Sequence, residues 1–165
     1  MEINNKFAIG CLVQWYEIEI IEEYVESVKQ ALDQIENKDN IIVDFTLVTN
    51  QDLEKVDESQ ITIDEIITRF EKMIDGFELN VTDKLVTIAD YRRWFNDYYC
   101  EKVDVLMWCE TDALIPKQTF IILDNLHTSV KDTTPKYTTF FSTCKMWDDS
   151  WKVLEHPEFT DKPFY

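Results

Sequence analysis

The sequence predicts an α/β protein with three layers, in which helices flank a mostly parallel sheet. Apolar stretches of strand length alternate along the chain with longer stretches whose apolar residues have helical spacing. The strand-like stretches 6–13, 41–48 and 103–109 are largely apolar on both faces. Strands have this composition when helices cover both sides of a parallel sheet. We therefore expect a Rossmann-like architecture, with ligands binding at the carboxyl ends of the strands.

The elements can be assigned from periodicity and from local signals. Ile21, Val25, Val28 and Leu32 recur at helical spacing, and Thr62 begins a capping box at the start of a second helix. The expected strands are 6–13, 41–48, 77–81, 103–109 and 137–144, and the expected helices are 17–37, 61–74, 89–101, 117–126 and 150–155.

Length and composition favour one soluble domain, residues 1–165. A chain of 165 residues buries about 70% of its unfolded surface, so it needs neither disulfides nor a structural metal. Its four cysteines have no metal-ligand spacing, which favours buried, reduced thiols. The sequence has no signal peptide and no apolar run of about 18 residues, so we expect a cytoplasmic protein without a transmembrane segment.

The net charge is −17, and it is uneven along the chain. Residues 1–80 carry 19 acidic and 6 basic side chains, a net charge of −13. Such a surface repels nucleic acid and anionic membranes, which excludes both as partners. One interpretation is a solvated, soluble surface. The alternative is an acidic, non-enzymatic interaction protein, such as a DNA mimic that binds a basic nucleic-acid-processing partner.

The clearest local signal is the acidic triplet Glu110-Thr111-Asp112, which follows the most apolar predicted strand. In an extended chain, a spacing of two puts both carboxylates on the same side. Two carboxylates this close repel each other unless they share a cation, and hard oxygen ligands suit Mg²⁺ or Mn²⁺. The competing interpretation is structural: Glu110 is solvated in a loop and Asp112 caps the next turn.

The stretch from the acidic triplet to Pro116 resembles the D-x-D region of GT-A glycosyltransferases, particularly the inverting family-2 type. There, an apolar strand ends in an acidic triplet, followed by a small residue, an apolar residue and often a proline. A helix with Arg92, Arg93 and Asn96 precedes the strand, as an Arg-Asn pair often does in that family. The resemblance covers residues 6–126, the donor-binding half. It implies a metal-dependent transfer of a sugar from a nucleoside-diphosphate donor to an acceptor that the sequence does not identify.

The resemblance also implies roles for single residues. Asp112 would be the principal ligand of Mn²⁺ or Mg²⁺, assisted by Glu110, and Arg92 or Arg93 would contact the diphosphate. Trp15 or Tyr16 would stack on the nucleotide base, and Asn50 or Asp52 would hydrogen-bond the base or ribose. These residues also have structural interpretations. The aromatic pair would pack in the core, and the two arginines would only offset the acidic surface. His156 would complete the metal shell, as a late histidine does in some GT-A enzymes. The alternative is an ordinary surface histidine.

The acceptor side of the fold is short in this sequence. Residues 127–165 correspond to an acceptor-side remnant or a truncated C-terminal part. The weak candidates for a catalytic base are Asp148, Asp149 and Glu155, none of which lies in a recognisable motif. Trp147 and Trp151 are possible members of an acceptor platform, with core packing as the alternative. The family's glycine-containing turn after the second strand is absent here, and the first acid of the triplet is Glu rather than Asp. Three interpretations therefore remain: an active enzyme, a donor-binding domain without turnover, and a structural subunit that keeps only the fold.

Overall fold

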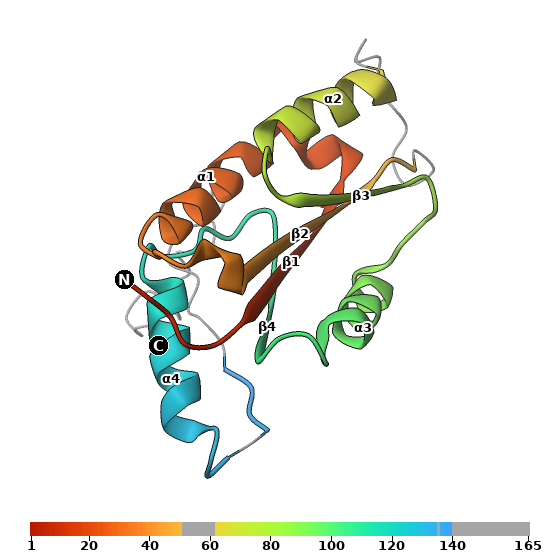
Figure 1. Cartoon of the computed structure of the whole chain (residues 1–165). Coiled ribbons are helices and arrows are strands. Elements are labelled where there is room, and N and C mark those ends of the chain that lie inside the picture. The colour runs from red at the N-terminus through yellow and green to blue at the C-terminus, as the bar shows by residue number, and fades with distance from the viewer. Residues whose placement is uncertain (51–61, 135, 140–165) are drawn as a thin grey trace, which may run out of the picture.

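The computed structural model describes residues 1–50, 62–134 and 136–139. These residues form a four-stranded, all-parallel sheet flanked by four α-helices, which confirms the predicted α/β class (Figure 1). The strands are β1 (Phe7–Gln14), β2 (Ile41–Val48), β3 (Glu78–Thr82) and β4 (Val105–Cys109). The helices are α1 (Ile21–Leu32), α2 (Ile63–Met73), α3 (Ile88–Tyr99) and α4 (Thr119–Val130), with short 3-10 helices at Trp15–Glu19 and Lys38–Asn40.

The strand order is β3-β2-β1-β4. The chain therefore moves outward from β1 through β2 to β3, and then returns to the other side of β1 to form β4. β1 pairs in parallel with β2 over its whole length and with β4 from Phe7 to Cys11. The point at which the strand order reverses lies between β1 and β4. In open α/β sheets this is the place where ligands bind, outside the carboxyl ends of the two strands.

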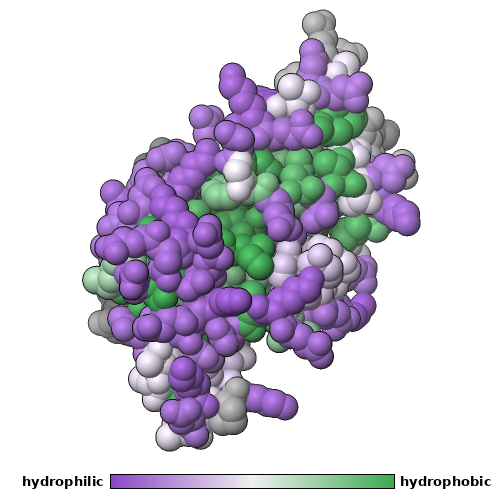
Figure 2. Space-filling model, in the orientation of Figure 1, coloured by the Kyte–Doolittle hydropathy of each residue, from purple (hydrophilic) through white to green (hydrophobic). Residues whose placement is uncertain are grey.

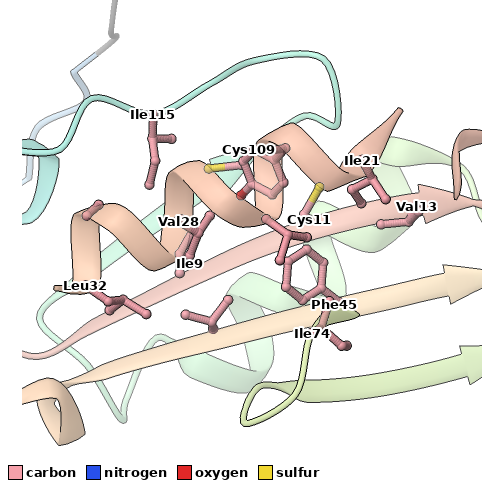
Figure 3. Packing of buried hydrophobic residues seen from close by; sticks show 14 of the residues in the cluster. Ile9, Cys11, Val13, Ile21, Val28, Leu32, Phe45, Ile74, Cys109 and Ile115 are labelled. Carbon is pink, nitrogen blue, oxygen red and sulfur yellow. The ribbon is translucent and has the colours of Figure 1, made fainter. Parts of the chain in front are cut away.

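One face of the sheet carries the main hydrophobic core. Side chains of β1 and β2 that alternate along each strand meet α1, α2 and α4 on this face. Phe45 is fully buried, and its ring lies edge-on to the rings of Tyr24 and Phe70. Figure 3 shows Cys11 of β1 and Cys109 of β4 in the layer between the sheet and α1. Both are free thiols, as predicted, and so is Cys100, which is exposed rather than buried.

The opposite face is covered by α3. A smaller cluster joins Ala8 of β1 to the buried aromatic residues of this helix, Tyr91, Phe95 and Tyr99. The α3 helix fits closely because β1 has a glycine beneath it. A Cβ at Gly10 would lie 2.4 Å from the Tyr91 hydroxyl oxygen and 2.5 Å from the Phe95 ring. This face also buries polar side chains of β2, among them Asp44 and Thr46.

The element boundaries differ from the predicted ones in a few places. The predicted helix 17–37 is a 3-10 helix followed by α1, because Glu17 bonds back to the Gln14 backbone and ends the strand with a separate turn. The capping box that starts at Thr62 is confirmed, and Gly76 has the positive φ (89°) expected after a helix end. Residues 137–139 form no regular strand, and the rest of the predicted strand 137–144 and helix 150–155 lie outside the described residues.

Hydrophilic residues cover most of the surface in Figure 2, with a band of hydrophobic residues visible between them. Among the described residues, no helix has both the length and the apolar character needed to cross a bilayer.

Candidate functional site

The acidic triplet lies at the carboxyl end of β4, beside the carboxyl end of β1. β4 ends at Cys109, and the backbone then forms a turn in which the Ala113 amide donates to the Glu110 carbonyl at 3.2 Å. The triplet is thus a turn and not an extended continuation of the strand. The spacing argument for two carboxylates on one side of an extended chain therefore does not apply, and each acid has its own surroundings. We call residues 110–113 the acidic turn.

Glu110 is held by an arginine of α3. The Arg92 guanidinium donates to a Glu110 carboxylate oxygen at 2.8 Å, and it also lies over the Trp108 ring, 5.4 Å from the ring centroid. The Trp108 indole N–H in turn donates to the side-chain oxygen of Asn96 at 3.0 Å. The predicted arginine helix therefore does reach the predicted acidic strand. Arg93 points elsewhere: it is mostly exposed and bonds Asp90 on its own helix at 3.2 Å.

Thr111, the middle residue of the triplet, connects the acidic turn to the loop after β1. Its hydroxyl donates to Glu17 Oε1 at 2.8 Å, and Thr111 is only 6% exposed. The other carboxylate oxygen of Glu17 accepts from the Gln14 backbone N–H at 2.6 Å. Glu17 therefore joins the two strand ends that flank the point of strand reversal.

Three carboxylates consequently share this edge of the sheet. Burial raises the pKa of Glu17, and the negative charges of Asp112 and Glu110 raise it further, whereas the bonds from Gln14 and Thr111 lower it. Asp112 is half-buried beside them. The two neighbouring charges increase the cost of ionising Glu17, and a bound cation would reverse that effect.

The described residues supply no complete metal cage. No three His, Cys, Asp or Glu side chains in residues 1–50, 62–134 and 136–139 lie close enough together to hold a metal alone. The donor set instead fits a hard divalent ion that keeps water and takes further oxygens from a phosphate group, since Mg²⁺ is commonly held by one or two carboxylates and its substrate. Glu110 and Asp112 are the residues that could provide those carboxylates.

A cavity of about 300 Å³ opens next to this edge, between the end of β1 and the start of α3. Its walls are mostly apolar, with Leu12, Leu85, Val86 and Ile88 among them, and Gln14, Glu17 and Thr87 provide the polar groups. This size and lining suit one planar ring or a similar small group. Glu17 belongs both to the cavity and to the link with the acidic turn.

The remaining predicted site residues lie in different surroundings. Trp15 is 8% exposed and belongs to the hydrophobic core, so the core interpretation holds for it, whereas Tyr16 is 40% exposed. The Asn50 side chain donates to the Asp83 carbonyl at 2.9 Å, which ties the end of β2 to the chain after β3. Asp52, Asp148, Asp149, Glu155 and His156 lie outside the described residues.

The sequence indicates neither the roles of Glu17 and Thr111 nor the cavity. Glu17 opens the predicted helix 17–37, where a favourable effect on the helix dipole is enough to explain an acid. Thr111 lies between two acids and has no motif of its own. Nothing local in the sequence marks either residue, because their partnership joins positions 94 residues apart.

The sequence matches no protein-family model, and no similar protein was found among curated proteins or solved structures. The functional argument therefore depends on the geometry of the chain itself.

Proposed function

We propose that this protein binds a nucleoside-diphosphate sugar together with Mn²⁺ or Mg²⁺ at the carboxyl ends of β1 and β4, as a GT-A-like glycosyltransferase or its donor-binding domain. The observation that carries the proposal is the strand order. It places the acidic turn and the loop after β1 on either side of the reversal between β1 and β4. Parallel sheets bind nucleotides at this position because the diverging connections leave a crevice there.

The parts of such a ligand have plausible places in the site. An apolar cavity beside polar Gln14 and Glu17 suits the base, which needs stacking surface and a few hydrogen bonds. Arg92 lies at the acidic turn and has the planar, bidentate geometry that fits phosphate oxygens. The cation would lie between Asp112 and the diphosphate, where it stabilises negative charge on the departing nucleotide.

Ligand binding would require Arg92 and Glu110 to exchange partners. In the structure they form an ion pair that is substantially exposed, so separating them costs little. With both ligands present, Glu110 would face the cation and Arg92 the phosphates. The exchange replaces one exposed pair by two charge-assisted contacts, which favours joint binding of cation and diphosphate over binding of either alone.

The chemical step of this proposal is an inverting transfer. An acceptor hydroxyl attacks the anomeric carbon, its proton passes to a base, and the bond from that carbon to the nucleoside diphosphate breaks. Among the described carboxylates of the site, none is left over as the base in this proposal. Glu17 is committed to two hydrogen bonds and Glu110 to Arg92, and Asp112 is assigned to the cation. The proposal is therefore stronger for donor binding than for turnover.

The experiment is a thermal and calorimetric titration with UDP and with GDP, each with and without Mn²⁺. At a ligand concentration 100 times Kd, binding should stabilise the native state by about 2.7 kcal/mol. Asp112→Asn should abolish the part that depends on Mn²⁺. Asp132→Asn, which changes an exposed acid on the turn after α4, should leave it intact. The proposal fails if neither nucleotide shifts the melting temperature in the presence of Mn²⁺.

The acidic interaction protein remains the second candidate. The acids Glu22, Glu23 and Glu26 of α1 line an open groove of about 590 Å³, but Lys29 and Lys72 line the same groove. This mixture of signs is unlike the uniform row of charges on a DNA backbone, so the groove supports mimicry less well than the strand ends support donor binding. Salt-sensitive capture of a basic protein, unchanged by Asp112→Asn, would favour this second candidate.

A further inference from the structure

The link between Glu17 and Thr111 has a position that suggests a role in the site. One carboxylate oxygen of Glu17 accepts from the Gln14 backbone within its own loop, at 2.6 Å. The other accepts from the Thr111 hydroxyl, at 2.8 Å, in the loop after a different strand. Thr111 is buried, and its neighbours on either side are the two acids of the triplet. Glu17 therefore holds the centre of the acidic turn.

A local structural role explains only half of this arrangement. The bond from the Gln14 amide completes the first turn of the 3-10 helix, as an acid does in many helix caps. A glutamine could also accept that bond, and it would avoid the repulsion that Glu17 experiences from Asp112 and Glu110. The bond from Thr111 contributes nothing to the cap. It instead fixes the acidic turn relative to β1, where the cavity begins.

We propose that Glu17 is a positioning residue that holds the acidic turn, through the Thr111 hydroxyl, in the geometry in which Asp112 binds a divalent cation. The role in cation binding rests on the proposed function. The claim that the bond keeps the acidic turn ordered is independent of that function. Bonds to an ionised acceptor are shorter and stronger than neutral ones, which suits a link that fixes the acidic turn to the loop after β1, while the ion pair of Glu110 with Arg92 fixes it to α3.

The same link makes the two positions depend on each other. If the bond from Thr111 favours the geometry in which Asp112 binds a cation, cation binding favours that bond in return, since coupling between two equilibria is reciprocal. Because Glu17 also lines the cavity, a ring bound there would contact the same carboxylate that orders the cation site.

The test compares Thr111→Val, which keeps the shape of the side chain but removes the hydroxyl, with Thr111→Ser, which keeps the hydroxyl. The first readout needs no ligand: hydrogen exchange of the backbone amides at 110–113, with the amides of β1 and β2 as an internal reference. We expect exchange in the acidic turn to be about tenfold faster in Thr111→Val and within about twofold of wild type in Thr111→Ser. The reference strands should not change in either variant.

The second readout is the affinity for Mn²⁺ alone, followed by electron paramagnetic resonance of the free ion. Its Kd should rise about three- to tenfold in Thr111→Val and stay near the wild-type value in Thr111→Ser. If Thr111→Val does not fold, Glu17→Gln provides the same comparison, with a weaker, uncharged acceptor and an effect in the same direction.

The outcomes separate the two proposals. Unchanged exchange in Thr111→Val, or equal effects of Val and Ser, would overturn the positioning role. If the wild type binds no Mn²⁺, the cation site of the proposed function fails, together with the role of the link in cation binding. The exchange data then still decide whether the link orders the turn.

Discussion

Along β2, Val43, Phe45 and Leu47 face α1 and α2, whereas the alternating residues Asp44 and Thr46 face α3. The first face is mostly apolar, although its core also buries the Trp15 indole N–H and the Tyr24 hydroxyl without partners among the described residues. The second buries polar atoms that lack hydrogen-bond partners among the described residues, namely Asp44 Oδ1, Thr46 Oγ1 and the Tyr91 hydroxyl. Each such atom costs free energy, because it has lost its water without gaining a partner.

The unpartnered polar atoms indicate that the face toward α3 lowers the stability of the native state. On β1, the residues that face α3 continue through Gly10 and Leu12 to Gln14, and the last two line the cavity beside the acidic turn. The α3 face is therefore continuous with the cavity of the candidate site, whereas the apolar core reaches the acidic turn through Cys109 at the end of β4. Departures from good packing and full hydrogen bonding tend to concentrate at functional sites. The predictions below test whether the two faces differ energetically as they do structurally.

The largest expected effect is on the apolar face. Phe45→Ala should lower the free energy of unfolding by about 3–5 kcal/mol, because it leaves a cavity between side chains of α1, α2 and the segment before β3. Urea unfolding followed by circular dichroism measures it. The matched variant is Phe95→Ala, also fully buried, whose ring neighbours Tyr91 and Tyr99 belong to its own helix. A larger loss for Phe95→Ala would contradict the comparison.

Gly10→Ala should have the next largest effect, on the α3 face. The added methyl group would meet the Tyr91 hydroxyl and the Phe95 ring at less than contact distance, so α3 must move outward. Overpacking of this kind costs about 1–3 kcal/mol. The check is again urea unfolding, with Ala8→Gly as a control that changes the same strand without adding volume. An unchanged midpoint for Gly10→Ala would mean that α3 is not seated as tightly as described.

The apolar face was predictable from the sequence, and most of the polar face was not. Strand 41–48 is a largely apolar run, and its burial follows from that composition. The equally apolar run 103–109 was expected to be buried as well, but it forms the edge strand β4, in which only Cys109 is buried, because strand order is not visible in composition. The capping box at Thr62 was also predictable from the sequence, because its two residues are only three positions apart. By contrast, Asp44 is one acid within an apolar run, and its bond from Tyr99 joins residues 55 positions apart.

The residues of the candidate site also divide into those that the sequence indicates and those that only the fold shows. Glu110 and Asp112 stand out because an acidic triplet follows an apolar strand, and Arg92 because a basic pair precedes it. The strand order that brings β1 beside β4 depends on tertiary packing, so neither the Glu17 link nor the cavity could be deduced before the fold was known. For Trp15 the sequence left base stacking and core packing open, and only the fold shows that its side chain belongs to the core.

Asp44→Asn should separate the cost of the charge from the cost of burial. Burial raises the pKa of Asp44, and Glu78 on the adjacent strand raises it further, while the bonds from Tyr99 and Asn80 lower it. The folded state therefore binds this proton more tightly than the unfolded state. Ionisation of Asp44 thus destabilises the wild type at neutral pH, and its stability recovers as pH falls through the raised pKa toward the ordinary value of about 3.9.

At pH 8 we accordingly expect Asp44→Asn to be more stable than the wild type by about 1–2 kcal/mol, since the amide is uncharged and can donate a hydrogen bond. The advantage should shrink as the pH approaches 4. The measured quantity is the difference between the two proteins at each pH, because Glu17, Glu65 and Asp90 also have shifted pKa values and contribute to the pH dependence of both. A difference that is constant with pH would show that Asp44 does not change its protonation state in this range.

The smallest effect, and the one that isolates a single atom, is expected for Tyr91→Phe. The Tyr91 hydroxyl is buried and has no hydrogen-bond partner in the part of the chain that the structure describes, so its removal should leave stability unchanged or raise it by up to about 1 kcal/mol. Tyr99→Phe, two turns further along α3, is the matched control. The Tyr99 hydroxyl donates to Asp44 at 2.8 Å, so its loss leaves a buried carboxylate less satisfied and should cost about 1–2 kcal/mol. Tyr91→Phe should also reduce the penalty of Gly10→Ala, because the atom nearest to the added methyl group is then absent. If instead both tyrosine variants lose stability equally, the Tyr91 hydroxyl has a partner such as a buried water molecule, and the α3 face is better satisfied than its protein atoms alone indicate.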